Sequence, residues 1–125
     1  MAVRRSLEGA QALIVDAAAV ERALVVVCGR STAHVRAALL TYGTEPHERE
    51  VDRVRMAIVK LVSEYGLDRL EEYVEIAKRD YRDVLMGAEY PGQAQAQVDL
   101  ADDERERLAA ADKQQYNDWL ERVAG

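Results

Sequence analysis

Two apolar stripes that flank Gly66 constrain the fold of this chain more than any other feature of its sequence. On both sides of Gly66, apolar side chains recur every three or four residues, which is the spacing of one face of an α-helix. The first stripe contains Val51, Val54, Ile58, Leu61, Val62 and Tyr65, and the second contains Leu70, Tyr73, Val74, Ala77, Tyr81, Val84, Leu85 and Ala88. This pattern predicts an antiparallel helical hairpin over residues 46–90, with the two stripes facing each other.

Residues that begin and end helices mark the limits of this hairpin. Pro46 is acceptable in the first turn of a helix, whereas Pro91 interrupts one. Gly66 suits the left-handed backbone just past a helix end, and Asp68 with Glu71 has the spacing of an N-terminal capping box. We therefore expect one helix from near Pro46 to Gly66 and a second helix that continues to Pro91.

Weaker signals organise the rest of the chain around the hairpin. A helix is expected over residues 32–41, with Ser31 as its cap. Residues 92–98 read as a polar connector, and a final helix is expected over residues 102–123. The first turn of that final helix is acidic, which suits the positive end of a helix, and Trp119 is expected to anchor it.

The N-terminal segment, residues 1–30, leaves its secondary structure open. Between residues 10 and 28, 15 of 19 side chains are apolar. A helix over residues 7–28 has its polar side chains spread around the whole axis, so it would be buried on several sides, in a bundle or in a subunit interface. Alternatively, "ALIVD" and "ALVVVC" form two short buried strands, because β-branched residues favour strands. The intervening "AAAVER" has no turn residue, which favours the helix.

Composition bounds the fold class and excludes several functions. A chain of 125 residues with two prolines and no phenylalanine favours a single all-α domain, residues 1–125, of four or five helices in a small bundle around the hairpin. The net charge is −6 and the acidic excess lies in the second half, so nucleic-acid binding is not expected. Charged residues interrupt the apolar N-terminal run, which argues against a membrane span. A single cysteine without a secretory signal indicates a cytoplasmic protein.

The loop Cys28–Thr32 is the most enzyme-like feature. Its members are Cys28, Gly29, Arg30, Ser31 and Thr32. A thiolate beside the backbone N–H groups of a starting helix could hold an anion, as phosphatase-like loops do. Those loops need an arginine where this chain has His34, and the phosphate-binding motif GxxxxGK[ST] is absent. The simpler interpretation of Cys28 is a small buried side chain next to a helix boundary.

No complete catalytic, metal or DNA-binding motif is present in the sequence. His47 and Glu50 lie three residues apart, but their order is the reverse of the Glu-x-x-His pair of di-iron bundles, so no metal or other cofactor is expected. The helices on either side of Gly43 suggest a helix-turn-helix regulator as a weaker alternative. The arginines of the second helix, such as Arg53 and Arg55, alternate with acidic residues, which is more typical of a solvated face.

Part of the hairpin resembles a known group of proteins. The stretches "VDRVRMAIVKL" and "LEEYVEIAKRDYRDVLMGAEYP", within residues 51–91, are similar to a segment of small uncharacterised bacterial helical proteins. The similarity covers about a third of the chain. It implies a bacterial origin and no activity or site residue.

These observations favour a protein that acts by contact with other proteins, itself included, over an enzyme. The apolar N-terminal segment is the expected contact surface. Its predicted interface residues are Leu13, Ile14, Val20, Leu24 and Val27. The alternative is a small-molecule or anion-binding protein, possibly enzymatic, that uses the loop Cys28–Thr32.

Overall fold

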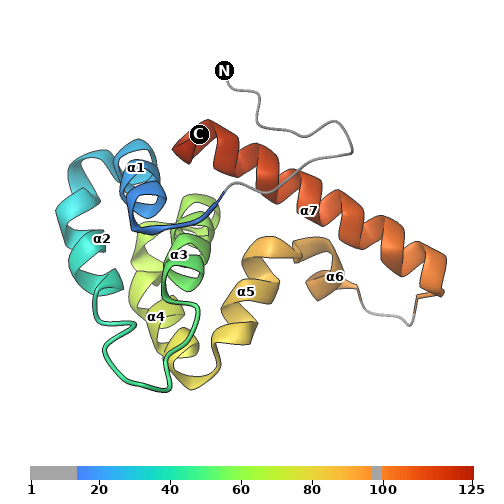
Figure 1. Cartoon of the computed structure of the whole chain (residues 1–125), viewed down its shortest axis with the longest axis horizontal. Coiled ribbons are helices and arrows are strands. Elements are labelled where there is room, and N and C mark those ends of the chain that lie inside the picture. The colour runs from blue at the N-terminus through green and yellow to red at the C-terminus, as the bar shows by residue number, and fades with distance from the viewer. Residues whose placement is uncertain (1–13, 97–99) are drawn as a thin grey trace.

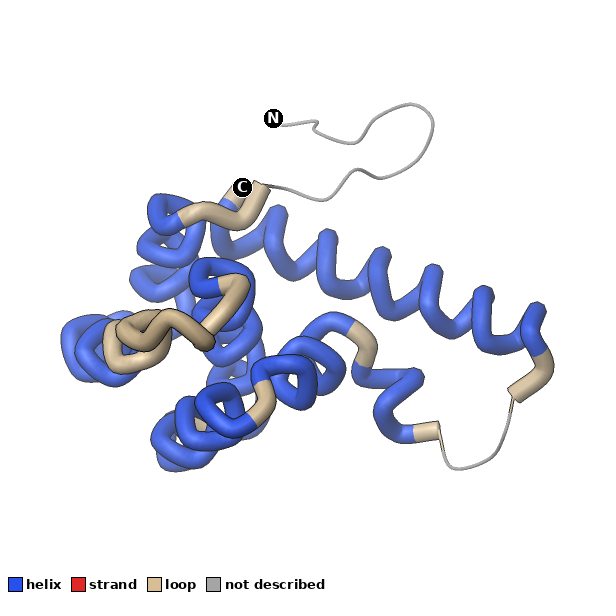
Figure 2. The backbone as a smooth tube through the Cα atoms, turned by 60° about the horizontal axis from the view of Figure 1, so that its bottom comes forward, coloured by secondary structure: helices blue, strands red, loops and turns tan. Residues whose placement is uncertain are grey.

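The computed structural model describes residues 14–96 and 100–125, and within these ranges the chain forms helices and no β-strand (Figure 1, Figure 2). The helices are α1 (Ala17–Cys28), α2 (Thr32–Leu39), α3 (Val51–Tyr65), α4 (Leu70–Arg79), α5 (Tyr81–Glu89), α6 (Pro91–Gln95) and α7 (Asp102–Ala124). Short 3₁₀ turns precede α2 and α4. The all-α prediction is confirmed. None of the described helices is long and apolar enough to cross a membrane.

Helix α3 lies at the centre of the core and packs against α1, α4 and α5. Its side chains from Met56 to Val62 are all buried, including that of Lys60. The helix ends at Gly66, whose φ of 114° is the positive backbone angle that the sequence predicted there. The far end of the stripe differs from the prediction, because Tyr65 is 50% exposed next to this turn.

The helix predicted to continue from Gly66 to Pro91 is two helices. Asp80 adopts an extended backbone, with φ −158° and ψ 98°, which ends α4. The Asp80 carboxylate then accepts a hydrogen bond from the backbone N–H of Arg82 and so caps α5. Because of this break, α4 and α5 both pack against α3, and the second arm of the predicted hairpin is bent. The described part of the chain therefore holds more helices than the four or five expected.

Two helix starts also differ from the prediction. Helix α4 begins at Leu70 after a 3₁₀ turn, and its cap residue Arg69 makes no side-chain hydrogen bond, so the capping box expected at Asp68 is wrong. Helix α3 begins at Val51 rather than near Pro46. The loop between α2 and α3 is held by polar contacts instead, since the Tyr42 hydroxyl donates to the backbone carbonyl of Arg49 at 2.7 Å.

The predicted connector contains a helix. Pro91 is the first residue of α6, where the missing N–H of proline costs nothing. The buried carboxylate of Asp112 on α7 accepts hydrogen bonds from the backbone N–H groups of Gly92 and Gln93, at 2.9 and 3.0 Å. This contact ties α6 to α7. Residues 97–98 of the predicted connector lie outside the described residues.

Helix α7 spans the molecule and confirms the predicted C-terminal helix to within a residue of each end. It contacts α6 near its start and α1 near its end, so the last helix of the chain packs against the first described helix (Figure 1). Trp119 is buried, as expected for an anchor, and its ring stacks on that of Tyr116 with 6.0 Å between the ring centroids.

The N-terminal segment is helical where it is described. Helix α1 is capped by Asp16, whose carboxylate accepts a hydrogen bond from the backbone N–H of Ala19 at 2.9 Å. It packs against α2, α3 and α7, but its outer face is exposed at Val25 and Val26, so the expected burial on several sides is met on the inner face only. The two-strand alternative is wrong for Ala17–Cys28. Residues 7–13 of the predicted helix lie outside the described residues.

Candidate functional site

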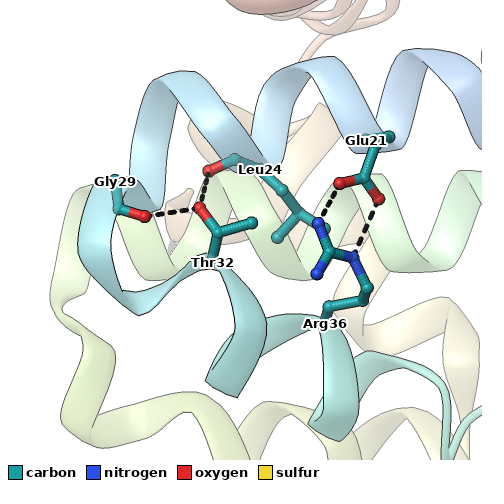
Figure 3. Close-up of polar contacts among 5 residues, drawn as sticks. All are labelled: Glu21, Leu24, Gly29, Thr32 and Arg36. Carbon is teal, nitrogen blue, oxygen red and sulfur yellow. Dashed lines mark hydrogen bonds and ion pairs between the residues drawn. The ribbon is translucent and has the colours of Figure 1, made fainter.

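The loop Cys28–Thr32 forms a tight turn between α1 and α2, and its polar groups bond to one another (Figure 3). The Thr32 hydroxyl is directed to backbone carbonyls, at 2.7 Å from that of Gly29 and 3.3 Å from that of Leu24. The predicted cap Ser31 makes no such side-chain hydrogen bond. Cys28 is buried, and burial raises the pKa of its thiol above the ordinary value. The thiol is therefore the neutral form near pH 7, which is the opposite of an activated thiolate.

An ion pair near this turn links α1 and α2. The guanidinium of Arg36 on α2 donates two hydrogen bonds to the carboxylate of Glu21 on α1, and its Nε lies 3.0 Å from Oε1 (Figure 3). The hydrogen bond with Arg36 holds the pKa of Glu21 below its ordinary value. The guanidinium of Arg36 is thus engaged with a partner. Arg30, the basic residue of the loop itself, is exposed. These contacts favour a structural role for the turn over anion binding.

The predicted interface residues do not form one surface. Val20 and Leu24 belong to the core of the chain, with 6% and 2% of their surfaces exposed, so their assignment to an interface is wrong. Val27 is half-buried and packs against that core. Ile14 is 82% exposed, and Leu13 lies outside the described residues. The sequence could not separate the inner from the outer face of α1, because valine and alanine occupy both.

The outer face of α1 carries an exposed apolar surface that the sequence did not indicate. Val25 and Val26 are 57% and 62% exposed. They line a shallow hollow of about 680 Å³ together with the last turn of α7. We call its apolar members the valine patch: Ala18, Val25, Val26, Val123 and Ala124. Arg22 also lines the hollow. Its Nε donates a hydrogen bond to the backbone carbonyl of Ala124 at 2.8 Å, which holds the guanidinium against the end of α7.

A second feature is a cavity of about 440 Å³ between α3, α5 and α7, which we call the polar cavity. Its lining residues are Val15, Glu50, Arg53, Glu89, Tyr90, Lys113, Tyr116, Asn117 and Leu120. Arg53 and the buried Glu89 form a two-point ion pair across it, with donor–acceptor distances of 2.8 and 2.7 Å. The hydrogen bonds with Glu89 raise the pKa of Arg53, so this guanidinium keeps its charge.

Two buried polar groups of the polar cavity make no hydrogen bond within the described residues. They are the hydroxyl of Tyr116 and the side-chain amide nitrogen of Asn117. Burial raises the pKa of Tyr116 far above its ordinary value, and the negative charge of Glu89 adds to this shift. The hydroxyl therefore keeps its proton at any physiological pH. Nothing in the sequence marked this site, since its residues come from four separate segments.

The weaker alternatives gain no geometric support. No group of three or more His, Cys, Asp or Glu side chains within residues 14–96 and 100–125 could hold a metal ion. Helix α3, the supposed DNA-reading helix, is the most deeply buried element of the core. Arg53 is paired with Glu89, and Arg55 donates to the backbone carbonyls of Leu39 and Tyr42.

Comparison with known proteins adds no assignment: no family model matches the chain, and no curated protein or solved structure matches it. The similarity to small bacterial helical proteins is therefore an expectation from the sequence alone. Among the features of the chain itself, the valine patch and the polar cavity combine a hollow with exposed apolar or unpartnered polar groups.

Proposed function

We propose that the protein works by contact with other protein molecules and that its first partner is a second copy of itself, bound at the valine patch. One observation supports this proposal: two adjacent valines, Val25 and Val26, are more than half exposed in an apolar hollow. Isolated exposed apolar side chains are common on protein surfaces, but a contiguous group in a concave surface is typical of a contact site.

A second copy fits this surface for two reasons. A two-fold axis places the same patch on both molecules, so an apolar patch is its own complement. The rim of the hollow carries both signs of charge, from Glu21, Arg22 and Arg122 among others, so two copies do not meet as surfaces of a single sign. A cytoplasmic location suits such an assembly, because the only cysteine is buried and forms no disulfide.

The size of the patch sets the expected affinity. Full burial of a valine side chain contributes about 1.5 kcal/mol or more, so the four half-exposed valines of two copies contribute on the order of 4 kcal/mol. Association costs on the order of 4–15 kcal/mol in lost freedom of motion. The valines offset only the lower end of this cost, so a measurable dimer also needs burial of the rest of the hollow. We therefore expect a weak dimer that forms at high protein concentration.

Sedimentation velocity over a series of protein concentrations tests the proposal. The unchanged chain should sediment faster as its concentration rises, whereas Val26→Glu should remain a monomer throughout. Met86→Glu is the matched control, because Met86 is an exposed apolar residue of α5, outside the valine patch. A chain that stays monomeric at every concentration contradicts self-association. Equal loss of association in both variants contradicts the assignment to the valine patch.

A further inference from the structure

We propose that the polar cavity between α3, α5 and α7 binds a small organic carboxylate with an apolar body. This site shares no lining residue with the hollow of the valine patch. Its volume of about 440 Å³ lies within the range of about 300–1,000 Å³ that is usual for small-molecule sites.

Two polar groups of the cavity lack a hydrogen-bond partner within the described residues. Tyr116 and Asn117 are 7% and 3% exposed, and both line the polar cavity. A buried polar group without a hydrogen bond costs free energy, which is why folded proteins satisfy nearly all of them. The Tyr116 hydroxyl and the Asn117 amide can both donate. A ligand that offers acceptor oxygens is the chemistry that would satisfy both groups at once.

The charged side chains around these donors favour an anionic ligand. Both carboxylate oxygens of Glu89 already accept a hydrogen bond from Arg53. Glu50 lies at the edge of the cavity, with its Oε1 3.7 Å from Nη1 of Arg53. Lys113 is exposed at the cavity and forms no ion pair with any residue that the structure describes. Arg53, Glu89 and Glu50 are thus paired with one another, and the charged group left without an ion-pair partner is the ammonium of Lys113, which favours an anion over a cation.

Part of the cavity wall is apolar. Val15 and Leu120 line the cavity together with Tyr116, whose aromatic ring stacks on Trp119. A bare inorganic anion would leave these apolar surfaces in contact with water. A carboxylate attached to a ring or a short alkyl chain would bury them. Apolar walls with a few placed polar groups are the usual composition of a small-molecule site.

Nuclear magnetic resonance titration of the full-length chain with benzoate, phenylacetate and hexanoate tests the proposal. At least one of these probes should shift the side-chain amide signals of Asn117 and the indole signal of Trp119 in a saturable way. Benzyl alcohol, which has the apolar body without the charge, should bind at least tenfold more weakly, because hydrogen bonds to a charged group are the stronger ones. Tyr116→Phe should weaken the carboxylate about tenfold.

Matched variants make the outcome decisive. Tyr65→Phe removes a hydroxyl from the surface of α3, away from the polar cavity, and should leave carboxylate binding unchanged. Tyr116→Phe keeps the ring, so its fold can be verified from an unchanged spectrum outside the cavity. The proposal is wrong if none of the three carboxylates shifts the Asn117 signals. It is also wrong if benzyl alcohol binds as tightly as benzoate, or if a folded Tyr116→Phe binds with unchanged affinity.

Discussion

The ion pair between Lys60 and Glu64 on α3 gives a direct test of how this core tolerates charge. The Lys60 side chain is only 1% exposed, and its Nζ lies 2.9 Å from Oε2 of Glu64, whose side chain is 31% exposed. The same ammonium lies 6.0 Å from the ring centroid of Tyr116. Glu64→Gln preserves the shape of the partner and removes its charge, so the buried ammonium keeps a hydrogen-bond acceptor but loses its counter-charge.

The expected change in the free energy of unfolding follows from how exposed Lys60 and Glu64 are. Pairs between exposed side chains contribute about 0.2–1 kcal/mol. Breaking a fully buried pair costs about 3–5 kcal/mol, because an uncompensated charge remains inside. One partner here is buried and the other is about one-third exposed, so Glu64→Gln should lower the free energy of unfolding by about 2 kcal/mol. Lys60→Met removes the buried charge itself and should change stability by less than about 1 kcal/mol.

Urea unfolding followed by the fluorescence of Trp119, the only tryptophan, measures these differences. The double variant should be no less stable than Lys60→Met, because the carboxylate matters only while the ammonium is present. Glu72→Gln is the control, since its pair with Arg69 lies on the surface of α4. If Glu64→Gln has no more effect than Glu72→Gln, then the Lys60 ammonium is hydrated and the reasoning from burial is refuted.

Further predictions concern single groups. Tyr116→Phe should raise the free energy of unfolding by about 1 kcal/mol, measured by thermal melting, because the buried hydroxyl has no partner within the described residues. Three backbone N–H donors outweigh the burial of Glu48 and lower its pKa, so Glu48→Gln should be less stable than the unchanged chain at pH 7. That difference should disappear as the pH falls below the ordinary value of 4.5, and a constant difference would contradict it. Gly92→Ala should destabilise the fold by about 1–3 kcal/mol in urea, because its Cβ would lie 2.8 Å from a carboxylate oxygen of Asp112. Cys28 should react with iodoacetamide at pH 7.5 far more slowly in the folded chain than in urea, and equal rates would contradict its burial and raised pKa.

The helices of the core could be predicted because the signals for them are local. Side chains three or four residues apart share a face, so the stripes on either side of Gly66 indicated helices before any contact was known. The break at Asp80 also has a local cause, since aspartate is a favoured cap, and that residue could have divided the long helix. The apolar stripe continued across Asp80 without a gap, and the prediction followed the stripe.

The sequence alone determined the all-α class, the positive backbone angle at Gly66 and the C-terminal helix, because each depends on residues that are close along the chain. It did not determine which face of α1 is buried, since valines occupy both faces and only the packing of α2, α3 and α7 selects the inner one. The polar cavity was likewise a tertiary outcome. Arg53 and Glu89 are 36 residues apart along the chain, and Tyr116 follows on a third helix, so only the packing of α3, α5 and α7 brings the three side chains together. Helix formation depends on local periodicity, whereas a site built from several helices depends on how those helices pack.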